Sequence, residues 1–288
     1  MSSFFHLAGI IPVASKPTGF KLPWDDCLIP IAPDYFAIDN AIYQAAMAGC
    51  ETIWLVANES TVPLVRKRVG DYIYDPLSVG THKRRFAPDK HRRMIAVYYV
   101  PIPPGEEHKE NCLPWSIIRG ALTANDISGA ISKWTMPDAF WVSFPFGLWD
   151  VNEIREHRKT ISSKTPVYLE HEGQTARDGR HLSFSFNQED LEGYTETFRQ
   201  LENEMSIPVD SEKEHFTNEI DLGIMFSEER PEEVVSVEPS WFHQITSWDE
   251  YRAALGDPRT GQLKSPGKIF LHYKEWNPIS EEGNEDLE

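Results

Sequence analysis

The feature that most constrains the fold is a strand–helix–strand pattern in the first 60 residues. His6–Val13 is an apolar run of strand length, and Thr52–Val56 is a second run that is apolar on both faces, as in the buried centre of a parallel sheet. Between them, apolar residues recur at helical spacing, and Gly49 follows where a left-handed residue commonly ends a helix. We therefore predict a β-α-β unit with a right-handed crossover, in which His6–Ile11 lies beside Thr52–Val56. Its helix should bury Ile38, Ile42 and Ala45.

The alternation of strands and helices continues to about residue 160. A second short apolar run, Cys27–Ile31, lies inside the first unit. The later pattern predicts strands at Met94–Val100 and Ala139–Phe144, and helices at Pro114–Ala124 and Val151–Lys159, the last with Asp150 as its N-cap. Alternating strands and helices favour the α/β class, so we predict a mostly parallel mixed sheet flanked by helices.

Beyond residue 160 the elements become shorter and the loops more acidic. The pattern predicts strands at Val167–Leu169, Leu182–Phe186 and Lys268–Tyr273, helices at Leu191–Glu204 and Trp248–Leu255, and a loop-rich segment at 206–240. We interpret residues 1–160 as an α/β core and residues 161–279 as an α+β C-terminal part that completes the same domain. Residues 280–288 form an acidic tail.

The charge of −17 is unevenly distributed along the chain. Residues 1–150 carry 14 basic and 15 acidic side chains, whereas residues 151–288 carry 14 and 30. Basic residues concentrate between 66 and 93, where Lys83, Arg84 and Arg85 are our candidates for binding an anion. The alternative is a solvated basic loop, or one that docks on the acidic half of the chain. The negative total opposes a nucleic acid partner.

Cysteine content and hydropathy indicate a compartment. Cys27, Cys50 and Cys112 are too few and too scattered for a disulfide framework or a zinc knuckle. No apolar stretch approaches the ~20 residues that span a bilayer, and no basic segment followed by an apolar run marks a secretory signal. We expect three reduced, partly buried thiols in a cytoplasmic protein that has no membrane partner.

Several segments carry a resemblance to a known family. They read LAGIIP at 7–12, LIPI at 28–31, IDNAI at 38–42 and AGCETIWLVAN at 48–58. Their order and spacing resemble the opening of the sugar-phosphate nucleotidyltransferases, and LPWSIIRGALTA at 113–124, FWVSF at 140–144 and SWDEYRAAL at 247–255 resemble later elements of that family. The resemblance implies a Rossmann-like, nucleotide-diphospho-sugar transferase-like fold. It also implies a reaction in which a sugar phosphate attacks the α-phosphorus of a nucleoside triphosphate and releases pyrophosphate.

By this resemblance, a nucleotide would bind near the end of the first strand and beside the helix that begins near residue 113. The residues at these places are Ala8, Gly9, Lys16, Lys21, Trp115 and Ser116. The family holds Mg²⁺ with carboxylates, so we expect Mg²⁺ as the cofactor if the chain is active. No other cofactor is implied.

The sequence departs from the family pattern at three chemical positions. The loop after Gly9 lacks Gly-Thr-Arg, and its bulky residues would hinder a phosphate from approaching main-chain N–H groups. Pro23–Asp26 stands where the family has Pro-Lys, and Ser143 stands where the strand should deliver a metal-binding Asp. Because this chemistry depends on positioned charges, we predict weak or no transfer activity.

Relocated groups are the alternative to lost activity. Lys21 and Asp150 are the catalytic candidates, and Asp150 and Asp249 are the candidates for holding a metal ion. Weaker metal candidates are the adjacent Asp25 and Asp26, and a mixed set of His171, Glu172, Asp178 and His181. Turn caps and loop polarity are the competing explanation for all of them. We interpret the aromatic residues Trp141, Phe144, Phe146 and Trp149 as core and pocket wall rather than as a platform for stacking bases.

Three functions remain open from the sequence. The first is a divergent nucleotidyltransferase-like protein that binds a nucleotide or a phosphorylated small molecule. The second is a non-catalytic assembly module with a protein partner, and the third is an active enzyme with relocated groups. Small divergent members of this kind also resemble bacteriophage proteins, so a virion-associated or host-modifying role is a further alternative, located in the host cytoplasm or the virion.

Overall fold

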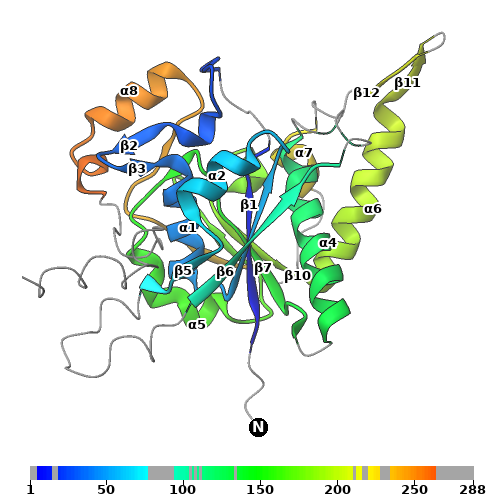
Figure 1. Cartoon of the computed structure of the whole chain (residues 1–288), viewed down its shortest axis with the longest axis horizontal. Coiled ribbons are helices and arrows are strands. Elements are labelled where there is room, and N and C mark those ends of the chain that lie inside the picture. Colours follow the sequence, from blue (N-terminus) through cyan, green and yellow to red (C-terminus); the bar gives the residue numbers. More distant parts are fainter. Residues whose placement is uncertain are drawn as a thin grey trace, which may run out of the picture.

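The computed structural model describes residues 5–14, 19–76, 94–103, 106, 109, 112–132, 135–209, 212–215, 220–227 and 234–263. At its centre is a mixed sheet of eight strands in the order β13-β9-β10-β7-β1-β4-β6-β5 (Figure 1). Four central strands run parallel: β1 (Leu7–Pro12), β4 (Thr52–Ala57), β6 (Met94–Pro101) and β7 (Ala139–Val142). This is the mostly parallel α/β sheet that the sequence predicts.

The outer strands complete the sheet on both sides. β10 (Phe184–Asn187) is antiparallel to β7 and to β9 (Val167–Leu169), and β13 (Val235–Val237) is parallel to β9. β5 (Tyr72–Tyr74) is antiparallel to β6 at the other edge. Three antiparallel strand pairs in the described part stand apart from this sheet: β2 (Pro30–Ala32) with β3 (Tyr35–Phe36), β8 (Gly147–Leu148) with β14 (His243–Gln244), and β11 (Ser206–Val209) with β12 (Glu212–His215).

Helices cover both faces of the sheet (Figure 1). One apolar cluster takes side chains from α1 (Ala37–Ala48), α2 (Val62–Val69), α5 (Arg158–Ile161) and α8 (Trp248–Gly256). The other cluster takes side chains from α4 (Leu113–Ile131), α6 (Gln188–Met205) and α7 (Leu222–Ser227). Successive residues of β1 enter the two clusters in alternation, which is why this strand is apolar throughout.

The predicted β-α-β unit is confirmed. β1 and β4 pair in parallel from Ala8 with Thr52 to Pro12 with Val56, and α1 between them buries Ile38, Ile42 and Ala45. Gly49 has φ of 105° and ends α1 in the left-handed conformation that glycine adopts without strain. The strand and the helix approach closely, since a Cβ on Gly9 would lie 3.0 Å from the Cβ of Ala45.

Most later predictions are also confirmed, and two need correction. The predicted helix Val151–Lys159 begins as a 3-10 turn at Glu153–His157 and is α-helical only in α5. Ile154 is the buried residue of that turn, so one apolar contact rather than a repeating stripe holds it. The segment 206–240, predicted to be loop-rich, contains β11, β12, α7 and β13. β13 is paired with β9, a distant partner that local composition does not reveal.

Several short elements of the described part were not predicted. α2 and β5 follow β4, and β5 adds an antiparallel strand at the edge of the sheet; the strand pairs β2–β3 and β8–β14 were also missed. The predicted strand Lys268–Tyr273 and the acidic tail 280–288 lie outside the described residues.

The three cysteines are free, as predicted, but they are fully rather than partly buried. Cys27, Cys50 and Cys112 each expose 2% or less of their surface. Burial raises the pKa of each thiol, that of Cys112 to about 12, because an apolar environment disfavours the thiolate.

Candidate functional site

The carboxyl edge of the parallel strands is the first place to look for a site. In open α/β sheets, ligands bind outside the carboxyl ends of the strands, where the strand order reverses. Here the chain proceeds from β1 outward through β4 to β6 and then returns to the other side of β1 as β7. The reversal therefore lies between β1 and β7. Val13 and Ala14 continue β1 there, and Ser143 follows β7.

Main-chain bonds hold the strand exits together at this edge. The N–H groups of Val13 and Ala14 both donate to the carbonyl of Val56, at 2.7 and 2.8 Å. The N–H of Ser143 donates to the carbonyl of Ile10 at 3.0 Å, which places Ser143 beside β1. Asn58, immediately after β4, donates from Nδ2 to the carbonyl of Ala14 at 3.4 Å. Asn58 and Ser143 therefore flank the end of β1.

The first turns of α4 reach the same edge. A Cβ on Gly120 would lie 2.8 Å from a methyl group of Ile10 and 2.8 Å from one of Val56, so the helix lies directly on β1 and β4 at this point. Ser116 is one turn nearer the helix N-terminus and shares the face of Gly120. Its position on α4 therefore places it over the exits of β1 and β4.

Three side-chain oxygens at this edge are buried without a hydrogen-bond partner among the described residues: Oδ1 of Asn58, Oγ of Ser116 and Oγ of Ser143. Three ring nitrogens in β7 or around the loop that follows it are also unpaired: Nε1 of Trp141, Nε1 of Trp149 and Nδ1 of His181. An unpaired buried polar group costs roughly 1–3 kcal/mol. Sequence reasoning selected Ser116 but not Asn58. The position of Asn58 directly after an apolar strand run is the signal that could have identified this residue.

The loop after β7 fills the edge with its own side chains. Phe144, Phe146, Leu148 and Trp149 are all buried, and so is Trp141 in β7, which confirms the interpretation of the aromatic residues as core. Two amides of α1 hold this loop, because Asn40 and Gln44 donate to the carbonyl of Gly147 at 3.2 and 2.8 Å. A Cβ on Gly147 would lie 2.0 Å from the carbonyl oxygen of His181, so only glycine fits there.

His181 packs against this loop from β10's side of the sheet. Its ring stacks on Phe144 with centroids 5.2 Å apart and planes 16° apart. The imidazole is buried, and burial lowers its pKa to about 4 because the charged form is disfavoured. The nearby charges of Glu250 and Arg180 act in opposite directions on this pKa. A neutral, stacked histidine serves here as a packing residue.

The predicted nucleotide-binding residues fall into two groups. Ala8 and Gly9 lie inside β1, where the strand pairs with β4 on one side and β7 on the other. Ser116 and Trp115 lie at the start of α4. The Trp115 ring stacks on Phe198 of α6 at 4.9 Å, and its indole N–H donates to Glu106 at 3.1 Å. Trp115 therefore joins α4 to α6. Lys109, which precedes α4, lies over the Trp115 ring at 4.3 Å, and its ammonium is 2.7 Å from Glu202 of α6.

The structure brings two other predicted residues, Lys21 and Asp249, to one part of the surface. Phe20 packs on Trp248 of α8 with centroids 5.0 Å apart, and each predicted residue follows one member of this ring pair. Lys21 is exposed and has a positive φ of 52°, a conformation uncommon outside glycine. Asp249 is 93% exposed and pairs with Arg252 at 3.4 Å.

The carboxylates considered for a metal ion serve as caps and local acceptors. Asp150 Oδ1 accepts from the main-chain N–H of Asn152 at 3.0 Å, and Asp178 accepts from the N–H of Thr175 at 2.8 Å. Asp25 accepts from the hydroxyl of Thr61 at 2.8 Å. In the described part of the chain, no group of three or more His, Cys, Asp or Glu side chains is arranged to hold a metal ion. These three carboxylates are thus engaged in local hydrogen bonds, and we derive no metal-dependent step from them.

Four predicted residues lie outside the described residues: Lys16 in the first loop, and Lys83, Arg84 and Arg85 in the basic segment. Their proposed contact with an anion stays a prediction.

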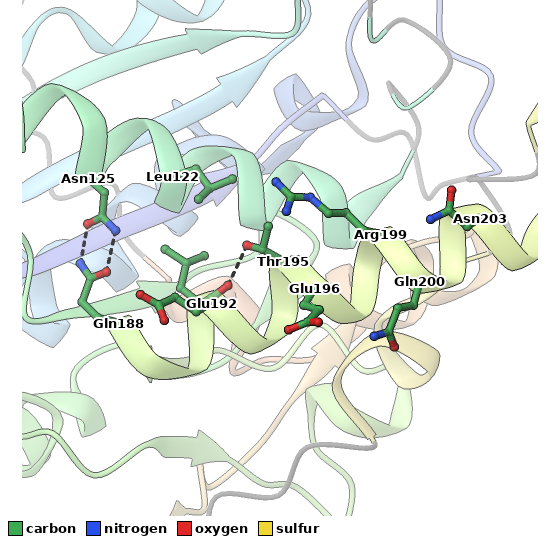
Figure 2. Close-up of a pocket in the computed structure, with 10 residues that line it drawn as sticks. Leu122, Asn125, Gln188, Glu192, Thr195, Glu196, Arg199, Gln200 and Asn203 are labelled. Carbon is green, nitrogen blue, oxygen red and sulfur yellow. Dashed lines mark hydrogen bonds between the residues drawn. The ribbon is translucent and has the colours of Figure 1, made fainter.

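Two cavities lie away from the carboxyl edge. A groove of about 670 Å³ runs between α4 and α6 (Figure 2), where the side-chain amides of Asn125 and Gln188 bond to each other at one end. Glu192, Glu196 and Arg199 line its length, so its polar groups carry both signs of charge. A cavity of about 400 Å³ lies at the opposite, amino edge of the central strands.

Comparisons with known proteins identify the fold. No protein-family profile matches the sequence, and a comparison with curated proteins gives no significant match. A protein of Bacillus anthracis assigned as a glucose-1-phosphate thymidylyltransferase, solved in complex with sucrose, is similar with a TM-score of 0.56. The identity is 9%, over 91% of this chain and 99% of that one. UDP-glucose pyrophosphorylase in complex with UDP-glucose is similar with a TM-score of 0.51 at 14% identity, over 88% and 97%.

A third structure, Rv0371c of Mycobacterium tuberculosis H37Rv with manganese, has a TM-score of 0.42 at 11% identity, over 88% of this chain and 99% of that one. That similarity is too distant to bear on metal binding here. No helix in the described part of the chain is long and apolar enough to cross a membrane. At these identities the similarities establish the fold alone, and the chain has a nucleotidyltransferase fold.

Proposed function

We propose that this chain is a divergent protein of nucleotidyltransferase fold that binds a nucleotide or a phosphorylated small molecule, with weak or no transfer activity. The main support for weak or absent transfer activity is the set of residues at the carboxyl end of β7. Ser143 and a buried aromatic loop stand there, where the chemistry requires a carboxylate facing a ligand. The charged candidate Asp150 is engaged in a local turn, where its Oδ1 accepts from the main-chain N–H of Asn152.

Support for retained binding comes from the polar atoms at the same edge. Asn58, Ser116 and Ser143 each keep a buried side-chain oxygen that no described residue satisfies. Buried polar atoms are usually paired with protein, ligand or ordered water, so three at one edge favour a polar molecule there. The two similar proteins above were solved with sucrose and with UDP-glucose.

The test combines a binding and a turnover measurement. UTP, dTTP and ATP are titrated calorimetrically at low and high salt, with and without Mg²⁺, and pyrophosphate release is followed with common hexose 1-phosphates. We expect salt-sensitive binding and no turnover in the ordinary range of ~1–10³ s⁻¹. Ser116→Ala should weaken binding, whereas Ser128→Ala, about three turns along the same helix, should not. Ordinary turnover would favour relocated catalytic groups and make Asp150 and Lys21 the next residues to substitute.

The second candidate is a non-catalytic assembly module, with a virion-associated role as its most specific form. The buried loop from Phe144 to Trp149 favours it, because side chains already fill the edge where ligands bind in this fold. Absence of binding by all three nucleotides at low salt would support this candidate over the first. The three free, buried thiols support our placing of the protein in the cytoplasm in either case.

A further inference from the structure

The cavity at the amino edge of the sheet has a wall on the sheet and a wall on a helix. Trp54 of β4 and Tyr98 of β6 are register partners whose rings stack with centroids 4.3 Å apart and planes 18° apart. Ile127 and Ile131, near the end of α4, line the cavity from the helix that covers this face. The cavity of about 400 Å³ therefore lies between flat aromatic and aliphatic surfaces, within the size range of small-molecule sites.

A chain of hydrogen bonds runs along one wall of the cavity. His6 Nδ1 lies 2.8 Å from the carbonyl of Thr135, and because a carbonyl only accepts, Nδ1 is the donor. Nε2 then accepts from the hydroxyl of Thr52 at 3.2 Å, and that hydroxyl accepts from the indole N–H of Trp54 at 3.0 Å. The chain engages the imidazole, the Thr52 hydroxyl and the indole N–H. Because the helix side of the cavity carries Ile127 and Ile131, a ligand between the walls would gain chiefly through apolar contact.

The charge of the lining residues limits the ligand further. The described residues that line the cavity include one carboxylate, Glu51, and no Lys or Arg. An anion entering here would lose its hydration without finding a cation, which is costly. Nucleotides and sugar phosphates are therefore disfavoured at this edge, in contrast to the ligand we propose for the carboxyl edge.

The rim of the cavity exposes large apolar side chains. Tyr98 is 38% exposed, Ile127 42% and Ile131 72%. Single exposed apolar residues are ordinary, but three around one cavity form a patch of the kind that marks binding sites. Tyr98 covers Trp54, which is almost fully buried, so the outer part of the Tyr98 ring is the aromatic surface available to a ligand.

We propose that this amino-edge cavity binds a small, uncharged, planar aromatic molecule between the Trp54–Tyr98 ring stack and the α4 side chains Ile127 and Ile131. Three observations support this proposal. The cavity has flat, opposed apolar walls, a hydrogen-bond chain engages the polar groups of one wall, and no Lys or Arg lines the cavity among the described residues. The site is independent of the nucleotide binding proposed above, because it lies at the other end of the same strands.

The experiment titrates indole and indole-3-acetate into the full chain by isothermal titration calorimetry or ligand-detected NMR. Indole should bind with a dissociation constant of about 1 mM or tighter, and the anionic probe should bind at least about tenfold more weakly. Tyr98→Ala should weaken indole binding at least about tenfold. Tyr72→Ala removes an exposed tyrosine of the neighbouring strand that does not line the cavity, so it should leave binding unchanged.

Because Tyr98→Ala could destabilise the protein, a second variant that keeps the fold tests the same site. Ile131 is mostly exposed, so Ile131→Lys should fold normally while placing a cation at the rim. Binding of indole-3-acetate should then tighten by about threefold or more, and binding of indole should not. The proposal is overturned if indole fails to bind at about 10 mM, if both probes bind the wild type equally, or if Ile131→Lys changes neither.

Discussion

The buried His181 makes the stability of this protein depend on pH in a way that can be isolated. Burial lowers the folded-state pKa to about 4, whereas an unperturbed histidine titrates near pH 6.5. Between these two values the unfolded chain binds a proton that the folded chain does not. The free energy of unfolding therefore falls as the pH drops from about 6.5 towards 4, and it is unaffected by this residue at higher pH.

The size of the effect follows from the two pKa values. The difference between the unfolded and folded pKa values of His181 corresponds to about 3 kcal/mol in the free energy of unfolding. About 2 kcal/mol of this stability should be lost by pH 5. Glu250 and Arg180 are the charged neighbours that influence this imidazole, and they act in opposite directions. Protonation would also place a charge against the Phe144 ring, within the loop that fills the carboxyl edge.

Chemical denaturation at pH 7.5 and pH 5.0 measures the effect in the wild type and in His181→Phe. Phenylalanine keeps a ring against Phe144 and removes the titration; His181→Gln is the second variant in case the larger ring does not fit. Other groups titrate equally in all three proteins, so their contribution cancels. The wild type should lose about 2 kcal/mol more than either variant between the two pH values. An equal loss in all three would refute the assignment of a neutral, buried His181.

Three further predictions concern packing. In α4, Gly120→Ala should lower the free energy of unfolding by about 1 kcal/mol or more because its Cβ meets two methyl groups at 2.8 Å. In Gly129→Ala the new Cβ would lie 3.7 Å from Met136 Sδ, an ordinary contact distance, so this substitution should raise the free energy of unfolding by up to about 1 kcal/mol, as urea denaturation would show. Arg68→Met should cost about 3 kcal/mol, because it leaves the fully buried Asp39 without the guanidinium at 2.7 Å, and adding Asp39→Asn should restore part of that loss. The three cysteines should react slowly with Ellman's reagent in the folded protein and give three free thiols after unfolding without reductant.

The fold was predictable because its first unit is specified locally. The apolar runs of β1 and β4, the helical spacing of α1 and the terminating Gly49 lie within 60 residues of one another, and each signal agrees with the others. Prediction failed where a distant partner decides the structure. β13 is held by β9, and the 3-10 turn at Glu153–His157 depends on a single buried side chain.

The candidate site was less predictable because it depends on contacts across the fold. Ser116 could be selected from its place at the start of a helix. The absence of a partner for its hydroxyl is a property of the packed edge. Likewise, the sequence gives no sign that the ring pair Phe20–Trp248 brings Lys21 and Asp249 to the same surface. The sequence did predict a capping role for Asp150, but the N-cap of the 3-10 turn is Asn152, whose N–H donates to Asp150.

The exit of β7 carries Ser143 rather than a carboxylate, and the loop that follows is held by several contacts at once. The amides of Asn40 and Gln44, which lie on α1, are committed to the carbonyl of Gly147, and Gly147 itself tolerates no side chain against His181. A carboxylate introduced in place of Ser143 would be fully buried, with no described cation to compensate it, so its pKa would rise and it would make a poor metal ligand. Ser143→Asp alone should therefore not create a metal site, because α1, β8 and the loop between β7 and β8 are packed together around Gly147.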